Sequence, residues 1–231
     1  MKHLITSALA ILTLAGCSSA TTPLRQASSL TEYSGGYADD SKTALYWLTQ
    51  RVDSPETSAD SVTFKDKTWY KSHYIWGDNN LQEIIRTGEK LSSSDKLVPY
   101  QMRLRFSGNG EAVYQRLRLN GKVIPMDKNQ IAEVKQQAND LVSTGKVQQK
   151  QGVELIQGYW ERGVFMTCEG RAFNNIELKD KLPTVVIDRL KDEENFAAFV
   201  GEYQSKKIVV DKLLILKHGN VDCIEKPNLK S

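Results

Sequence analysis

Four arginines in two short segments are the side chains of this sequence best suited to chemistry. Arg103 and Arg105 are separated by one apolar residue, and Arg116 and Arg118 are spaced in the same way. Because side chains alternate between the two faces of a strand, each pair should project from one face. Guanidinium groups bind phosphates and carboxylates through paired hydrogen bonds. The chemistry that this spacing predicts is the recognition of an anion.

The two segments are joined by a turn signal that predicts their register. Asn109-Gly110 favours a two-residue type I′ hairpin turn, because both residues tolerate the positive φ angles that this turn needs. The pairs that such a turn sets opposite each other are Gln101 with Arg118, Arg103 with Arg116, and Arg105 with Tyr114. Opposed like charges are unfavourable unless an anion or a neighbouring carboxylate relieves them.

This register defines a candidate anion-binding face with an aromatic side chain beside it. Its members are Arg103, Arg105, Tyr114, Arg116 and Arg118. The expected partner is an anionic group, such as a lipopolysaccharide phosphate or a glycan acid, or an acidic protein surface. The alternative is a solvated face whose charge is neutralised by Glu83 or Glu89 on a nearby strand.

Catalytic signals are weak. Acid–base and nucleophilic catalysis usually needs a positioned base, commonly histidine, and after residue 16 the chain has only His73 and His218. We interpret both as surface or strand-end residues. No nucleophile elbow, zinc-binding helix or phosphate loop occurs, and no Cys/His spacing favours a metal. The sequence therefore predicts no catalytic residue, metal or cofactor, and a non-enzymatic protein; a hydrolase remains the alternative.

The first 16 residues have the pattern of a secretory signal peptide. Lys2 and His3 precede an apolar run from Leu4 to Leu14 that three hydroxyl residues interrupt. The run is about a dozen residues, shorter than the roughly 20 that a membrane-spanning helix needs. The sequence therefore predicts an N-terminal signal peptide and no membrane-spanning helix.

Leu14-Ala15-Gly16-Cys17 matches the bacterial lipobox. The match implies cleavage before Cys17, a diacylglyceryl group on its thiol and an acyl chain on the new amine, which together anchor a protein stably. An ordinary signal with a coincidental cysteine is the alternative. Ser18 follows, and in Gram-negative lipoproteins a residue other than Asp there generally implies transfer to the outer membrane. We expect a lipid-anchored protein on the periplasmic face of that membrane.

Two cysteines remain in the mature chain. In an oxidising compartment two thiols of one domain tend to pair, so we expect a Cys168–Cys223 disulfide. Two buried free thiols or a metal pair are the alternatives. On the chain-entropy estimate, a bridge closing a loop of this size stabilises the fold by about 4 kcal/mol.

The composition is that of a globular chain. The 231 residues are 40% hydrophobic and 26% charged, with a formal net charge of +3. This weak and dispersed charge argues against nucleic acid as a partner. The length suits one large domain or two small ones.

Periodicity divides the chain into four parts. Residues 17–42 are rich in small polar residues and are expected to be a flexible tether, with Tyr33 and Tyr37 entering a first edge strand. Residues 43–150 read as an antiparallel β domain, with a second hairpin turn at Asn120-Gly121. A helix from Asp127 to Gly145 follows it, with Asp127 and Gln130 as a capping box.

Residues 151–231 read as a second, smaller domain. Short β segments, including Thr184 to Leu190, are followed by a helical pattern of apolar residues from Phe196 to Tyr203 and a long strand from Lys207 to Lys217. This order predicts a small OB-like β-barrel. The expected fold class is α+β: an antiparallel β-sheet domain with a connecting helix, followed by the OB-like domain.

Two segments carry a resemblance to a known family. The lipobox and the stretch from Gly158 to Phe173, GYWERGVFMTCEGRAF, are similar to those of the YjaH family of uncharacterised enterobacterial lipoproteins of unknown function. The resemblance extends along the whole chain and implies a place in the envelope without an established activity. We expect a binding or interaction module in cell-envelope maintenance or stress response, the alternative being a hydrolase of envelope polymers.

Overall fold

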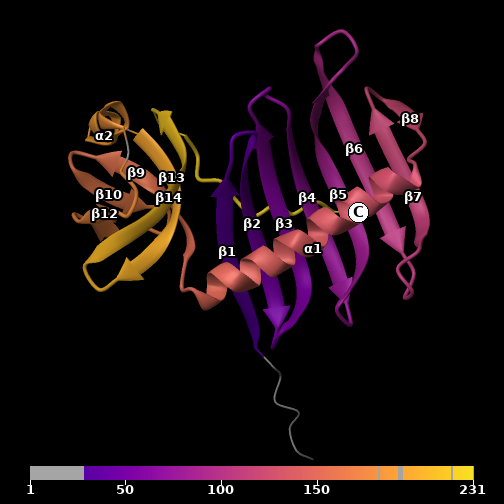
Figure 1. Ribbon diagram of the computed structural model, residues 1–231, viewed down its shortest axis with the longest axis horizontal. Coiled ribbons are helices and arrows are strands. Elements are labelled where there is room, and N and C mark those ends of the chain that lie inside the picture. The colour runs from indigo at the N-terminus through magenta and orange to yellow at the C-terminus, as the bar shows by residue number, and fades with distance from the viewer. Residues whose placement is uncertain (1–28, 182, 192–194, 220, 231) are drawn as a thin grey trace, which may run out of the picture.

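The structure is a computed structural model that describes residues 29–181, 183–191, 195–219 and 221–230. The predicted signal peptide, Cys17 and the start of the predicted tether therefore lie outside the described residues. Most of the described chain is β-structure arranged in two sheets. Figure 1 shows the larger sheet with a long helix across one face and the smaller sheet beside its β1 edge.

The larger sheet is an antiparallel meander in which each strand pairs with the next. Its strands are β1 (Leu30–Ala38), β2 (Lys42–Arg51), β3 (Ser54–Phe64), β4 (Trp69–Gly77), β5 (Asn80–Leu91), β6 (Leu97–Phe106), β7 (Ala112–Leu119) and β8 (Lys122–Ile124). This confirms the antiparallel sheet predicted from the period of two. The expected edge strand is confirmed, because β1 contains Tyr33 and Tyr37 and lies at the edge of the sheet. It spans more of the predicted tether than expected, since it pairs with β2 from Leu30 to Ala38 and buries Tyr33 against the sheet core.

The two predicted hairpin turns differ in the structure. Asn120 and Gly121 have φ angles of 49° and 77°, as a type I′ turn requires. At the other turn only Gly110 has a positive φ, the Gly110 amide donates to the Ser107 carbonyl, and the register shifts by one between Arg105 and Phe106. The two-residue turn at Asn109-Gly110 is therefore wrong, but the bulge offsets the extra loop residue and the predicted pairing beyond it is correct.

The helix α1 (Lys128–Lys150) lies across this sheet. Its predicted capping box is present: the Gln130 amide donates to Asp127 Oδ1 at 2.9 Å, and the Asp127 amide donates to Gln130 Oε1 at 3.1 Å. The predicted end at Gly145 is wrong, because the helix continues past it to Lys150. Gly145 is buried on the sheet beside Tyr46 and Leu48, so its small size serves packing.

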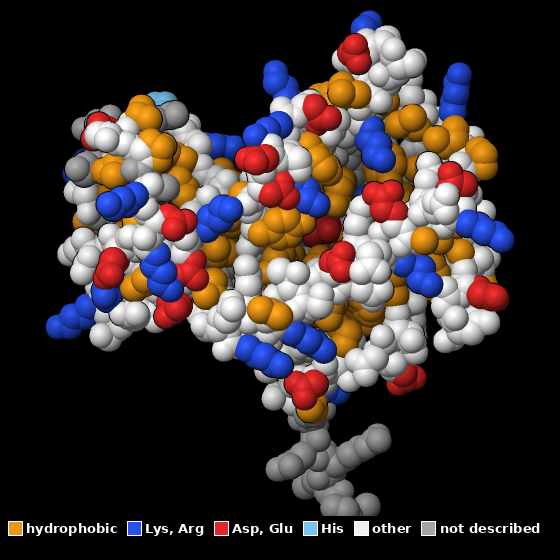
Figure 2. Space-filling model, viewed as in Figure 1, with side chains coloured by type: hydrophobic (Ala, Val, Ile, Leu, Met, Phe, Trp, Pro, Cys, Tyr) orange, Lys and Arg blue, Asp and Glu red, His pale blue; other side chains and the backbone are white. Residues whose placement is uncertain are grey.

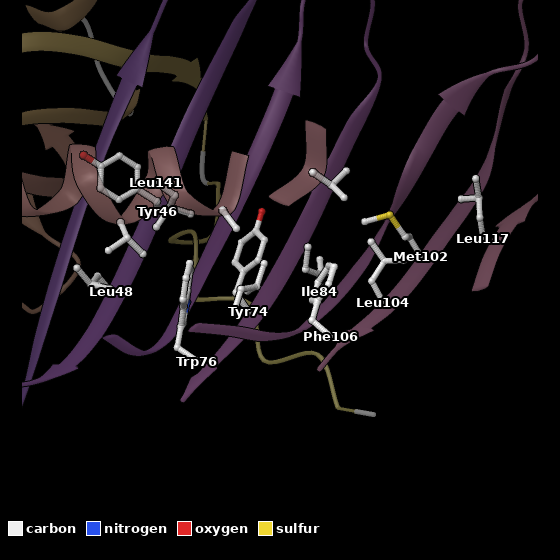
Figure 3. Packing of buried hydrophobic residues seen from close by; sticks show 14 of the residues in the cluster. Tyr46, Leu48, Tyr74, Trp76, Ile84, Met102, Leu104, Phe106, Leu117 and Leu141 are labelled. Atoms are coloured by element: carbon white, nitrogen blue, oxygen red, sulfur yellow. The ribbon is translucent and has the colours of Figure 1, made fainter. Parts of the chain in front are cut away.

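The main core lies between α1 and the sheet. Figure 3 shows side chains of the strands pointing toward the helix, among them Tyr46, Tyr74, Ile84 and Leu104. Each of these four is at most 1% exposed. Full burial of a side chain of this size contributes about 1.5–3 kcal/mol, so this face holds the helix firmly.

The second sheet has six strands in the order β11-β10-β9-β13-β14-β12. They are β9 (Glu154–Glu161), β10 (Val164–Thr167), β11 (Ala172–Phe173), β12 (Ile176–Leu178), β13 (Asn195–Gln204) and β14 (Lys207–His218). All pairs are antiparallel except β12 with β14. The OB-like barrel is not confirmed, because β11 and β12 are the edges of this sheet and do not pair with each other.

Two elements of the second sheet region have the opposite secondary structure to the one predicted. Residues 196–203, predicted as a helix, belong to β13, while the predicted strand at residues 184–190 is α2 (Thr184–Lys191). β13 is a central strand buried on both faces from Asn195 to Gly201, so its apolar residues follow no period of two. In α2 the Pro183 carbonyl accepts the amides of Val186 and Ile187, so the first turn forms despite its β-branched residues.

The two sheets share apolar packing at the β1–β2 edge. Leu45 of β2 packs with Val153, Phe196 and Leu214 of the second part of the chain. The Tyr33 hydroxyl donates to the Val153 carbonyl at 2.5 Å. Among the described residues, no helix has both the length and the apolar character needed to cross a bilayer.

Candidate functional site

The predicted arginine face lies on the side of the large sheet away from α1. In β6, Met102 and Leu104 point to the helix core, so Arg103 points to the opposite face. The pairing of β6 with β7 sets Arg103 opposite Arg116 and Gln101 opposite Arg118, as the sequence predicted. Arg105 lies opposite Tyr114 in the same register.

A carboxylate on the adjoining strand neutralises part of this face. Glu83 Oε1 accepts from Arg103 Nε at 2.6 Å and from Arg105 Nε at 2.8 Å. Desolvation raises the pKa of Glu83, but the hydrogen bonds and charges of the two arginines outweigh it and lower the pKa overall. Glu89, the other carboxylate considered, instead accepts from Trp69 Nε1 at 2.8 Å.

The other two arginines have no such partner. In the described part of the chain, neither Arg116 nor Arg118 has a carboxylate within ion-pair distance. The Nε atom of Arg118 is buried and makes no hydrogen bond. A buried donor left without an acceptor costs roughly 1–3 kcal/mol, so this edge of the face is electrostatically incomplete.

Residues 221–230, which we call the C-terminal segment, run from the second sheet to the arginine-bearing face of the first. A Cys168–Cys223 disulfide attaches this segment to the second sheet, as the sequence predicted. The Gln157 side chain also holds it, since Gln157 donates to the Ile224 carbonyl and accepts from its amide, both at 3.0 Å. The Tyr159 hydroxyl donates to the Val221 carbonyl at 2.7 Å.

From there the C-terminal segment crosses to the arginine-bearing face. Lys226 Nζ donates to Thr49 Oγ1 at 2.6 Å and to Glu32 Oε1 at 3.2 Å. Pro227, the next residue, is buried. In Figure 1 this segment runs behind the large sheet while α1 lies in front, so the two cover opposite faces.

The sheet and the C-terminal segment enclose a groove of about 670 Å³. The side chains that the sheet contributes to its lining include Thr87, Gln101, Arg103, Arg116 and Arg118, and the segment contributes Asn228, Leu229 and Lys230. We call this the arginine groove. A volume of this size is typical of a small-molecule or headgroup site.

The structure brings together only part of the predicted set. Arg103, Arg116 and Arg118 line the arginine groove, whereas Tyr114 does not, and Arg105 lies instead in an adjoining hollow with Glu83 and Val113. Sequence reasoning missed residues 228–230, because nothing local indicates that they cross to a sheet far away in the chain.

Among the described residues, no histidine or carboxylate lines the arginine groove. His73 of β4 lies half-buried on the arginine-bearing face of the sheet. Burial, and to a smaller extent the charge of Lys226, lowers the pKa of His73. His218 ends β14. Over the described residues, no three side chains of His, Cys, Asp or Glu gather as metal ligands would.

Comparison with known proteins identifies a family and nothing closer. The model of a family described as "Protein of unknown function (DUF1481)" matches residues 34–228. No curated protein matches the chain. No solved structure matches it either.

Proposed function

Because the chain belongs to the DUF1481 family of proteins of unknown function, we propose its role from the site alone: it is a lipid-anchored, non-catalytic binding module whose arginine groove takes a phosphate-bearing envelope glycolipid. The single observation that carries the proposal is the unmatched charge of Arg116 and Arg118 beside a groove. Among the described residues, Glu83 is the one carboxylate that pairs with this face, and it pairs with Arg103 and Arg105 only.

A phosphate is the group that best completes this arrangement. Its oxygens can accept several charge-assisted hydrogen bonds at once, including one from the buried Arg118 Nε. Lys230 adds a further cation on the segment side, and Gln101 and Asn228 add amides for sugar hydroxyls. The groove thus offers positive charge and neutral polar groups together, as a phosphorylated sugar needs.

The lining favours binding over hydrolysis. The described side chains that line the groove include no histidine, cysteine or carboxylate that could act as nucleophile or general base. A hydrolase of envelope polymers would need such a group within hydrogen-bond reach of its substrate. No feature of the groove supplies one, so binding is the better proposal.

The membrane anchor is part of the same proposal. Lipidation at Cys17 would hold the described domain at the periplasmic face of the outer membrane, within reach of envelope glycolipid that passes through the periplasm to that membrane. The test is radiolabelled palmitate incorporation in cells, with Cys17→Ser as the comparison. Loss of label and release of the Cys17→Ser protein from sedimented envelopes is expected; a Cys17→Ser protein that still incorporates label would refute the anchor.

Groove binding is tested with a defined probe. Lipid A micelles, and lipid A from which the phosphates have been removed, are titrated with the soluble domain lacking residues 1–28. We expect phosphate-dependent binding that Arg116→Gln/Arg118→Gln weakens by about tenfold or more, since a hydrogen bond to a charged group is worth about 1.5–3 kcal/mol.

A double variant matched in charge serves as the control. Lys122→Gln/Lys128→Gln removes two positive charges from exposed positions outside the arginine groove. It should leave binding nearly unchanged if the arginine groove is the site, whereas an effect of net charge alone would be equal in the two double variants. Equal loss in both double variants, or no loss in either, would refute the groove as the site.

A further inference from the structure

A second polar centre lies on the other face of the large sheet, beneath α1. Arg86 of β5 is only 4% exposed. Its Nε donates to Ser72 Oγ at 2.8 Å, and its Nη2 donates to the Tyr74 hydroxyl at 3.0 Å. Its guanidinium carbon lies 3.9 Å from the centre of the Tyr70 ring. These contacts fix the position of the cation.

The charge of Arg86 has no direct counter-charge. Across the described residues, no carboxylate lies within ion-pair distance of its guanidinium. Asp60 reaches it indirectly, through Tyr74, whose hydroxyl donates to Asp60 Oδ2 at 2.8 Å while accepting from Arg86, and through Ser72, which also hydrogen-bonds both residues. Buried charges in proteins are ordinarily paired directly, so this cation is an exception that calls for an explanation.

A cavity of about 430 Å³ opens beside the guanidinium. Figure 2 views this face and shows it hollowed next to α1, with hydrophobic side chains on the floor. The apolar residues that line the cavity include Phe64, Tyr70, Leu91, Leu117, Met126 and Val134. Its volume lies within the range that small-molecule sites occupy.

Charged side chains of both signs line the cavity: the cations Arg86 and Lys90, and the carboxylates Asp66, Glu89 and Glu133. Glu89 already accepts a hydrogen bond from Trp69 Nε1. Lys90 lies over the Tyr100 ring, with its Nζ 4.3 Å from the ring centre, and burial and then the charge of Arg86 lower its pKa. An anion placed between Lys90 and Arg86 would offset the repulsion between the two cations and favour the charged form of Lys90. Glu133, an exposed residue of α1, lines the same cavity and would oppose that anion.

From this geometry we propose that the cavity under α1 binds a small amphiphilic carboxylate, with its carboxylate on Arg86 and Lys90 and its apolar body against Tyr70, Leu117 and Val134. The carboxylate supplies the counter-charge that Arg86 lacks, and its planar pair of oxygens suits a guanidinium. The apolar body replaces water on the hydrophobic lining. This site lies on the opposite face of the sheet from the arginine groove and does not depend on it.

The probes are dodecanoate and 3-phenylpropanoate, titrated into the soluble domain lacking residues 1–28. Trp69 lines the cavity, so its fluorescence reports occupancy, and calorimetry gives the affinity. Dodecanol has the same chain without the charge and should bind at least about tenfold more weakly than dodecanoate. The two carboxylates distinguish an aliphatic ligand from an aromatic one, and binding of either supports the proposal.

Two single variants should move the affinity in opposite directions. Lys90→Gln removes an attracting charge and should weaken dodecanoate binding roughly fivefold or more, whereas Glu133→Gln removes a repelling charge and should strengthen it roughly twofold. Loss of folding cannot produce both shifts. Lys128→Gln, an exposed change at the start of α1 outside the cavity, is the control and should have no effect.

Arg86→Met provides the decisive comparison where it folds, and should abolish the preference for dodecanoate over dodecanol. The proposal is overturned if neither carboxylate binds the unmodified protein, or if dodecanol binds as tightly as dodecanoate. It is also overturned if Lys90→Gln and Glu133→Gln shift the affinity in the same direction.

Discussion

Cys223 is bonded to Cys168 across a sequence separation of 55 residues, and this bond fixes the start of the C-terminal segment on the second sheet. The rest of that segment then reaches the arginine-bearing face of the first sheet through Lys226. One covalent link therefore helps to position a wall of a groove that lies on a different sheet.

Removing this bond should destabilise the fold and loosen the groove wall. The Cys168→Ser/Cys223→Ser variant is expected to lose about 4 kcal/mol of unfolding free energy on the chain-entropy estimate, measured by urea denaturation. Hydrogen exchange at the Ile224 amide should also quicken, because the bridge holds the segment that carries this amide against Gln157. Equal stability of the variant and the oxidised protein would contradict a structural role.

Glu83→Gln should lower stability at neutral pH only. The pKa of Glu83 is lowered from 4.5, so its contribution is present above pH 4.5 and is lost as the pH falls through the lower folded value. We expect a deficit of about 1 kcal/mol at pH 7, typical of a partly exposed ion pair, that shrinks at pH 3. Denaturation at both pH values checks this. A deficit unchanged at pH 3 would mean that packing, and not charge, is responsible.

His73 should make the protein less stable in mild acid. Burial lowers its pKa from 6.5, and Lys226 adds to this effect while Glu83 opposes it. Below pH 6.5 the unfolded chain therefore binds a proton more readily than the folded one, so stability falls as the pH drops from 7 toward 5. His73→Gln should flatten this part of the profile of melting temperature against pH, and an unaltered slope would exclude His73 as its cause.

Gly145→Ala should stabilise the protein by about 0.5–1 kcal/mol, because alanine favours a helix interior over glycine. An added Cβ at Gly145 would meet Tyr46 and Leu48 at 3.4 and 3.6 Å, which is ordinary contact. Gly88→Ala is the contrasting case: its Cβ would lie 2.1 Å from the Trp69 carbonyl, so stability should fall. Thermal unfolding of both variants checks this: the melting temperature should rise for Gly145→Ala, through helix propensity, and fall for Gly88→Ala, through steric overlap.

Local patterns determined much of the first sheet. The alternation around Arg103 and Arg116 predicted both their strands and their pairing, because side-chain direction in a hairpin follows from the period of two. The capping box at Asp127 and Gln130 was equally readable, since all its groups lie within four residues.

The same reasoning was wrong where burial overrides pattern. Phe196 and Phe199 read as a helical face, yet they lie in a strand covered on both sides by other elements. Gly145 was predicted to end the helix, yet the helix continues to Lys150. The missing side chain of Gly145 leaves room for Tyr46 to pack against the helix there. A sequence pattern records which residues are apolar, and not whether one face or two will be covered.

The sequence by itself predicted the disulfide partners, the arginine pairing and the helix start, because each depends on neighbours along the chain or on the two cysteines that follow Cys17. Only the tertiary structure decided that Lys226 to Lys230 lie on the arginine face, and that Arg86 faces a cavity with no described carboxylate within ion-pair distance of its guanidinium. These contacts join segments far apart in the chain, and their energies depend on burial, which exists only once the chain has folded.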